Sequence, residues 1–269
     1  MKCAICNNIE MKYYFSKKFQ EEHIRSILPA SDYFRCENCG LVVSKTLVEM
    51  PSEKWVVLNQ QFHETLERTS RITLLDQPPY LHQVQMLHVL SERGVISLNN
   101  ALDYAAGYGN MARLLQKYHR KKILLFDPYM QQDDAEVVYV SGNDLGTYDT
   151  VFTSAFFEHS TQRTYLDHVN SLVNQDGAMF VYTLVSEEVP QDPDWFYLDP
   201  VHAIFQTKKS MELLMQQWGY ESSLYSVPAQ TWCLFRKHKT ETKETINRIN
   251  QEFQEQVFIY NTGFAFPSI

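Results

Sequence analysis

The chain has 269 residues, 44% of them hydrophobic, and a formal net charge of -8. This length is enough for one large hydrophobic core and a second, smaller domain. The acidic balance disfavours a protein that binds nucleic acid over a wide face, because phosphate contacts need clustered lysine and arginine. We find no signal peptide and no apolar run long enough to span a membrane, which predicts a cytoplasmic protein.

Four of the five cysteines form two C-x-x-C pairs near the N-terminus, Cys3 with Cys6 and Cys36 with Cys39. Two short turns that each supply two thiolates are typical of a tetrahedral structural zinc site. Disulfides are the alternative, but a reducing cytoplasm disfavours them. We therefore predict a zinc-ribbon-like domain over residues 1–50, with its own hairpin or helix between the two pairs.

Residues 51–82 are the predicted helical linker, or lid, between this domain and the rest of the chain. Ser52 to Glu67 has helical spacing, and Arg71 to Gln77 follows it. His63 and Tyr80 are candidates for lining a binding pocket from this segment. The alternative is that its aromatic side chains only pack the two domains together.

The centre of the chain has the pattern of a strand, a tight turn, a helix and a second strand. Leu102 ends the first apolar strand, and small residues alternate through a turn that reaches Asn110. The second strand, Ile123 to Phe126, is followed at once by Asp127. An acidic residue in this place binds ribose when an open parallel sheet holds a nucleoside at its carboxyl edge. The pattern thus predicts a nucleoside pocket.

Strands and helices continue to alternate after this unit, which favours an α/β fold with a doubly wound, Rossmann-like sheet over residues 83–238. Residues 239–269 are expected to form a C-terminal helix and an aromatic tail that packs on its own core or on a second subunit of a homodimer. The further predicted elements are the strands Val137 to Val140, Asp149 to Ser154, Ala178 to Leu184, Ser222 to Val227 and Thr231 to Arg236, a turn at Asp176-Gly177, and the helices Met111 to Tyr118, Tyr165 to Val173, Ser210 to Trp218 and Thr240 to Val257.

The turn after the first strand has Asp103, Ala105, Gly107 and Gly109 at every second position. This spacing resembles motif I of the class I S-adenosylmethionine-dependent methyltransferases, although Ala105 stands where that family most often has glycine. The resemblance implies S-adenosylmethionine as cofactor, with Asp127 on the ribose hydroxyls. The cofactor-binding residues that it implies are Asp103, Ala105, Gly107, Gly109, Asn110, Asp127, Pro128, Asp144, Ser154 and Phe156.

Glu158 and His159 follow the predicted fourth strand, where the same resemblance places the acceptor site. His159 is a candidate general base, because an imidazole titrates near neutral pH. Glu158 could orient His159, or the two could share a divalent cation, which nothing beyond the pair itself supports. His202, in the loop after the fifth strand, is the competing base. The predicted catalytic residues are thus His159, Glu158 and His202, and the predicted substrate-binding residues are Tyr80, Trp195, Tyr197 and His202.

The arrangement of two C-x-x-C pairs ahead of the methyltransferase core is similar to bacterial methyltransferases that act on nucleotide sugars and related polysaccharide or natural-product precursors. Those enzymes commonly carry a further C-terminal domain that is missing after Lys237 here. The resemblance therefore favours methyl transfer to an oxygen of a small anionic metabolite or glycan precursor. The alternatives are a ribosomal-RNA-type methyltransferase and an inactive cofactor-binding scaffold.

Overall fold

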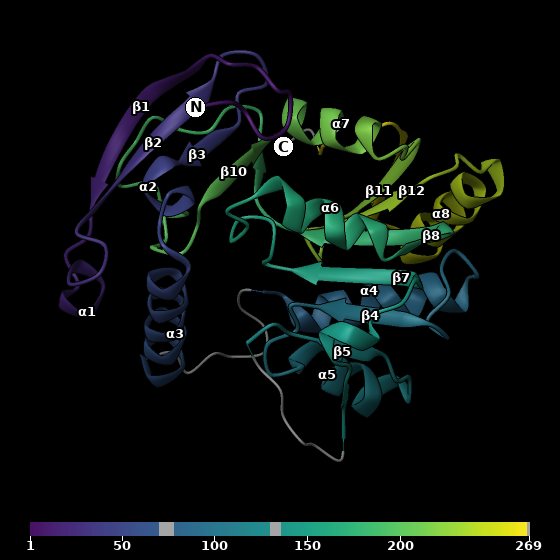
Figure 1. Cartoon of the computed structure of the whole chain (residues 1–269). Helices are drawn as coiled ribbons and strands as arrows, with labels where there is room; N and C mark the ends of the chain where they lie inside the picture. The colour runs from purple at the N-terminus through teal and green to yellow at the C-terminus, as the bar shows by residue number, and fades with distance from the viewer. Residues whose placement is uncertain (70–77, 130–135, 268–269) are drawn as a thin grey trace. The chain divides into compact units, whose positions relative to one another are not determined.

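A computed structural model describes residues 1–69, 78–129 and 136–267 of the chain (Figure 1). The chain divides into two compact units. The first unit comprises Met1–Thr73, Phe157–Leu166 and Leu184–Leu214, and the second comprises Leu74–Phe156, Asp167–Thr183 and Met215–Ile269. The first unit therefore continues beyond the predicted domain boundary at residue 50 and includes two later segments. The predicted segment Arg71 to Gln77 lies outside the described residues.

The first unit contains a five-stranded sheet in the order β1-β2-β3-β10-β9. The first three strands pair antiparallel, β10 pairs antiparallel with β3, and β9 joins β10 in parallel. Its core includes Phe15, Tyr33 and Phe205. The elements of this unit are β1 (Met11–Lys18), α1 (Glu22–Arg25), β2 (Ala30–Cys36), β3 (Val42–Ser44), α2 (Lys45–Val48), α3 (Ser52–Thr69), β9 (Val185–Ser186) and β10 (Ile204–Thr207).

The predicted structure between the two cysteine pairs is confirmed, because β1, α1 and β2 lie there and the two strands form an antiparallel hairpin (Figure 1). The helix predicted from Ser52 is confirmed as α3. The sequence did not predict β9 and β10. These two strands are short and lie in a segment that we expected to be loop, and β10 becomes a strand by pairing with β3 far back in the sequence.

The second unit contains an eight-stranded sheet in the order β13-β11-β12-β8-β7-β4-β5-β6. Its elements are α4 (Tyr80–Glu92), β4 (Ala101–Tyr104), α5 (Asn110–His119), β5 (Leu124–Phe126), β6 (Val138–Tyr139), a 3-10 turn at Gly142–Asp144, β7 (Tyr148–Ser154), β8 (Val173–Tyr182), β11 (Ser222–Ser226), β12 (Thr231–Phe235), α8 (Thr240–Phe253) and β13 (Phe258–Thr262). Two further helices, α6 (Arg163–Ser171) and α7 (Lys208–Gln217), lie where the chain passes from one unit to the other.

The five neighbouring strands β8, β7, β4, β5 and β6 are parallel to one another. The strands β12, β11 and β13 complete the sheet in antiparallel pairings. The sheet is therefore mixed, and the expectation of a wholly parallel sheet is wrong for its last three strands. Short connections explain this, because a tight turn such as the one between β11 and β12 can join only antiparallel neighbours. Leu115, Leu125 and Phe152 are fully buried in the core that α4 and α5 form with the sheet.

Two local predictions are corrected. Asp103 and Tyr104 belong to β4, so the strand runs two residues beyond Leu102 before the turn begins. Asp176-Gly177 is not a turn between elements but lies inside β8, at a shift in the register of its pairing with β7. A β-carbon on Gly177 would lie 2.9 Å from the Asp149 carbonyl oxygen, so a glycine there reflects close backbone approach within the sheet.

The aromatic tail packs on the sheet of its own unit. β13 pairs with β11, the Trp232 indole N–H donates to the Ala265 carbonyl at 2.8 Å, and Phe264 stacks on Trp232. The helix predicted to reach Val257 ends at Phe253. Among the described residues no helix is both long and apolar enough to cross a membrane.

Candidate functional site

The cofactor turn, Tyr104 to Asn110, connects β4 to α5 at the carboxyl edge of the parallel strands. Ala105, Gly107 and Gly109 all have left-handed backbone, with φ values of 59°, 52° and 70°. This conformation costs an alanine about 1–2 kcal/mol relative to ordinary backbone. At Gly109 a β-carbon would also lie 2.6 Å from Leu125 Cδ1. A β-carbon at Gly109 would thus be too close to Leu125, whereas Ala105 adopts its left-handed conformation at a cost in free energy.

Asp127 follows β5 directly and lies against this turn. Its carboxylate accepts hydrogen bonds from the Gly107 N–H at 2.9 Å and from the Tyr129 N–H at 2.8 Å. The Tyr139 hydroxyl donates to the Gly107 carbonyl at 2.6 Å and holds the turn from the next strand. The sequence did not identify Tyr139, because a tyrosine in a strand has no pattern that separates a turn contact from packing.

Asp103 is the last but one residue of β4 and is 3% exposed. Burial, and secondarily the neighbouring Asp127 carboxylate, raises the pKa of Asp103 well above its ordinary value. Two carboxylates at one turn disfavour each other's charge and favour a positively charged ligand. The two neighbouring carboxyl groups are therefore compatible with a ligand that carries a positive charge.

The remaining predicted cofactor residues lie in the same unit. Asn110 begins α5, Pro128 is exposed beyond Asp127, and the Phe156 ring packs edge-on against Tyr104 with centroids 5.1 Å apart. Ser154 ends β7, and Asp144 accepts from the Ser141 hydroxyl at 2.6 Å in the 3-10 turn. Their contacts with a cofactor stay predictions.

The cysteine cluster, Cys3, Cys6, Cys36 and Cys39, brings four free thiols together within the first unit. The Sγ atoms of Cys3 and Cys39 are 3.6 Å apart, and those of Cys6 and Cys36 are 3.4 Å apart. A tetrahedral zinc with Zn–S bonds of about 2.3 Å separates its sulfurs by roughly 3.8 Å. The Cys39 thiol also lowers the pKa of Cys3 to about 5. The donor set and its spacing fit zinc.

Polar side chains from later segments of the first unit fix the loops around this cluster. The Thr207 hydroxyl donates to the Cys39 carbonyl, Lys209 to the Asn38 carbonyl, and Arg163 to the Ala4 carbonyl at 3.3 Å. These bonds explain why β10 and the start of α7 belong to the same compact unit as the N-terminal residues. Arg163 and Lys209 thus stabilise the cysteine loops.

The Glu-His-His cluster, Glu158, His159 and His202, also lies within the first unit. One ligand atom from each residue lies within 4.8 Å of the others. The Tyr197 hydroxyl donates to Glu158 Oε1 at 2.7 Å, and the Tyr197 carbonyl bonds with His202 Nδ1 at 2.8 Å. Burial, followed by the nearby His202 and His63, lowers the pKa of His159 well below its ordinary value. His159 is therefore a neutral imidazole at physiological pH.

The structure brings the three predicted catalytic residues together, and three of the predicted substrate residues are neighbours in the first unit: the ring centroids of Trp195 and Tyr197 are 5.7 Å apart, and those of Tyr197 and His202 are 4.6 Å apart. Trp195 packs against Phe205 in the core of the first unit, and the Tyr197 hydroxyl lies between Glu158 and the Leu184 N–H. Tyr80 begins α4 in the second unit, where burial raises its pKa. His63 stacks on His159 with ring centroids 5.8 Å apart. Their contacts with a substrate stay predictions.

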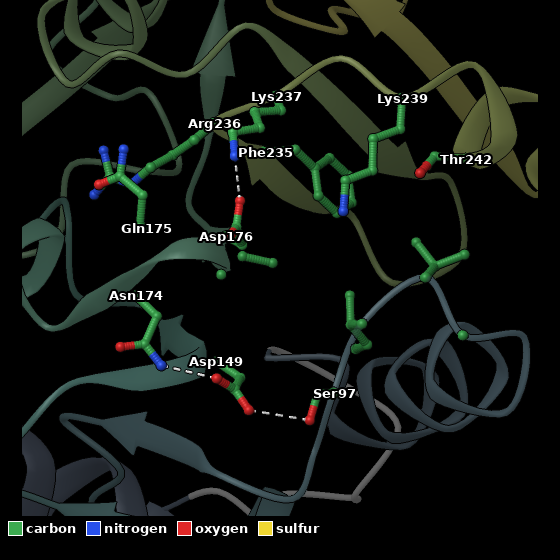
Figure 2. A pocket seen from close by; sticks show the side chains of 15 residues that line it. Ser97, Asp149, Asn174, Gln175, Asp176, Phe235, Arg236, Lys237, Lys239 and Thr242 are labelled. Carbon is green, nitrogen blue, oxygen red and sulfur yellow. Dashed lines mark hydrogen bonds and ion pairs between the residues drawn. The ribbon is translucent and has the colours of Figure 1, made fainter.

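A cavity of about 570 Å³ lies at the other edge of the second unit's sheet, by the amino ends of β7 and β8 (Figure 2). Its polar lining is largely paired within itself. Asp149 accepts from Ser97 and Asn174, and Asp176 forms an ion pair with Lys237 at 2.6 Å. This cavity is therefore separate from the cofactor turn.

The mixed sheet, with a glycine turn and a carboxylate at its carboxyl edge, defines an α/β protein that binds a nucleoside-containing cofactor. Residues 62–223 match the family described as "Methyltransferase domain". The chain belongs to this family of methyltransferase domains.

Solved structures with similar folds are distant in sequence. An O-methyltransferase family protein from Burkholderia thailandensis is 14% identical, with a TM-score of 0.45, over 72% of this chain and 62% of that one, so the chain spans less than two thirds of that protein. The 1,6-didemethyltoxoflavin-N1-methyltransferase of the same organism, solved with its substrate and S-adenosylhomocysteine, is 13% identical over 83% and 97%, with a TM-score of 0.47. Magnesium protoporphyrin IX methyltransferase from Synechocystis, solved with S-adenosylhomocysteine, is 13% identical over 66% and 94%, with a TM-score of 0.41. No curated protein matches the chain.

Proposed function

We propose that the protein transfers the methyl group of S-adenosylmethionine to an oxygen atom of a small anionic metabolite, nucleotide sugar or other precursor of a polysaccharide or natural product. The observation that carries the cofactor part is the Asp127 carboxylate, bonded to the Gly107 N–H of the cofactor turn. The buried Asp103 beside it favours the positive charges that a sulfonium cofactor brings.

An oxygen acceptor is supported by the Glu-His-His cluster. A hydroxyl must lose its proton as the methyl group is transferred, and a neutral imidazole can accept that proton. His159 and His202 are the two candidates in the cluster.

The glycan-precursor class is supported by the cysteine cluster ahead of the methyltransferase domain, the arrangement that resembles nucleotide-sugar methyltransferases. We assign this cluster to one structural zinc. The thiols fill all four positions of a tetrahedral ion, which leaves no position for a substrate. Zinc in this place stabilises the first unit and takes no part in methyl transfer.

Calorimetric titration with S-adenosylmethionine and S-adenosylhomocysteine tests the cofactor assignment. Asp127→Ala removes charge-assisted hydrogen bonds worth about 1.5–3 kcal/mol each, so we expect a loss of affinity of about 100- to 10,000-fold for two such bonds. Asp176→Ala is the matched control, because this carboxylate lies at the opposite edge of the same sheet. Equal affinities for the wild type and Asp127→Ala would contradict the assignment.

Transfer of a labelled methyl group tests the acceptor class. We expect incorporation into sugar nucleotides or other small hydroxylated anions, and none into RNA. Salt-dependent methylation of RNA would replace the proposed acceptor with the nucleic-acid alternative. Cofactor binding without transfer to any acceptor would favour the scaffold alternative.

A further inference from the structure

The Glu-His-His cluster has two ordinary explanations, a hydrogen-bonded structural network and a general base with its orienting carboxylate. Either explanation should leave the buried polar atoms of the cluster paired with one another. Glu158 is 1% exposed and His202 7% exposed, so pairing matters energetically for both. The observed contacts do not complete this pairing.

Glu158 uses one carboxylate oxygen and leaves the other without a partner. Its Oε1 accepts from the Tyr197 hydroxyl at 2.7 Å. Its Oε2 is buried and has no hydrogen-bond partner within the part of the chain that the structure describes. A buried anionic oxygen without a hydrogen bond is strongly unfavourable unless a positive charge lies against it. Neither histidine donates to this oxygen.

His202 is held in the tautomer that a metal ligand needs. A carbonyl oxygen only accepts, so the 2.8 Å bond between His202 Nδ1 and the Tyr197 carbonyl places a proton on Nδ1. In the neutral ring the Nε2 atom then carries the lone pair. Asp199 Oδ2 is 4.0 Å from this Nε2 atom, too far for a hydrogen bond. Metal-binding histidines typically donate their other N–H to a carbonyl in this way.

Tyr197 joins the two halves of the cluster, because its hydroxyl holds Glu158 and its carbonyl holds His202. One residue thus holds the side chains of two potential ligands. His159 lies beside them, with its ring centroid 5.0 Å from that of His202. The result is two imidazoles and one carboxylate whose ligand atoms lie within 4.8 Å of one another.

We propose that Glu158, His159 and His202 bind a divalent transition-metal cation, with Tyr197 as the residue that positions two of its ligands. Two histidines and one carboxylate suit zinc, iron or manganese and leave coordination positions open. A cation here would use the lone pairs of both imidazoles, so it would take the place of the general base by lowering the pKa of a hydroxyl bound to it. Only this last role, activation of the acceptor oxygen, rests on the proposed function.

A cobalt(II) titration of the full chain, first loaded with zinc at the cysteine cluster, tests the site. Zinc binds thiolates more tightly than cobalt does, so cobalt should report on the second site. We expect one equivalent of cobalt with visible d–d absorption and no sulfur-to-cobalt charge transfer. X-ray absorption at the cobalt edge should show only nitrogen and oxygen ligands, which tests the site without any variant.

Three variants assign the ligands. Glu158→Gln and His202→Ala should abolish the cobalt absorption, and Tyr197→Phe should weaken cobalt binding about 10- to 100-fold as a positioning residue. His88→Asn is the matched control, because His88 stacks on His119 in the second unit with ring centroids 3.8 Å apart. It should bind cobalt like the wild type.

Failure of zinc-loaded wild type to bind cobalt, a sulfur shell around the bound cobalt, or equal binding by Glu158→Gln would each overturn the proposal. No methyl donor or acceptor is present in these measurements. A failed titration therefore leaves the methyltransferase reaction standing, and a failed acceptor screen leaves the metal site standing.

Discussion

The two units build their polar sites in opposite ways. In the second unit the cofactor turn consists of consecutive residues, and Asp127 reaches it from the next strand in the sheet. In the first unit the cysteine cluster joins residues thirty or more positions apart, and the Glu-His-His cluster joins the beginning of the segment Phe157–Leu166 to a loop residue of a later segment. One site follows from local backbone geometry, and the others depend on the fold of the whole unit.

This difference indicates what stabilises each unit. The second unit has an eight-stranded sheet and a continuous apolar core, so its turn is held by packing. The first unit packs an apolar cluster around Phe15, Tyr33 and Phe205 and also brings four thiols together. Metal binding at such a thiol cluster is coupled to folding. We expect the largest effects of substitution where the metal holds the fold.

Replacement of Cys36 by serine should have the largest effect. Structural zinc sites bind with on the order of 10 kcal/mol of apparent free energy, and that binding is coupled to folding. We expect Cys36→Ser to lose bound zinc and to lose protection of the β1 and β2 amides against hydrogen exchange, whereas the second unit still binds cofactor. Metal analysis and exchange measurements on the full chain check this.

Cys233→Ala is the matched control for this prediction. Cys233 is fully buried in β12 of the second unit, away from the cysteine cluster. Its replacement should leave the zinc content unchanged. A metal-free Cys36→Ser protein with normal protection of β1 and β2 would show that the first unit needs no metal, and the contrast between the units would disappear.

Glycine substitutions in the cofactor turn should have an intermediate effect. In Gly109→Ala the new β-carbon meets Leu125 at 2.6 Å in left-handed backbone, so overpacking and strain together cost about 2–4 kcal/mol. Cofactor affinity should fall with stability. Gly107→Ala has the same backbone requirement but no atom within 4 Å of the new carbon, so only about 1–2 kcal/mol is expected.

Urea unfolding and cofactor titration of both variants check this order. Equal losses for Gly107→Ala and Gly109→Ala would mean that backbone conformation alone, and not the close approach to Leu125, determines the glycine requirement.

The sequence predicted the second unit well because its signals are local. The alternation of small residues located the turn, and Asp127 followed from its place directly after the second strand. The strand and helix order was predicted, but the antiparallel end of the sheet and the position of Asp176-Gly177 inside β8 were not, since pairing partners decide both.

The first unit was predicted only where residue type is diagnostic. Four cysteines in two pairs indicate one cluster whatever lies between them. The link from Tyr197 to Glu158 and His202 could not be predicted, because it depends on the conformation of a long loop and uses a backbone carbonyl that every residue has. β10 was missed for a similar reason, since its strand conformation comes from pairing with β3.

The smallest predicted effect concerns the stability that the second unit loses by burying Asp103. The pKa of Asp103 is raised in the folded state, so the folded protein binds a proton more tightly than the unfolded chain. Stability then falls as pH rises from the unfolded value near 3.9 through the folded pKa, and the full cost is present above it. Asp103→Asn should therefore stabilise the cofactor-free second unit at neutral pH, weaken cofactor binding, and lose its advantage as pH falls toward 4.

Asp176→Asn provides a control of opposite sign in the same sheet. The Lys237 ammonium lowers the pKa of Asp176, so the native ion pair stabilises the folded state above the unfolded pKa and that contribution disappears as pH falls. Urea unfolding followed by exchange of β4 and β7 amides at two pH values separates the two cases. If Asp103→Asn instead destabilised the cofactor-free protein at neutral pH, Asp103 would be a structural residue of β4. Its burial would then not lower stability in exchange for binding a cation.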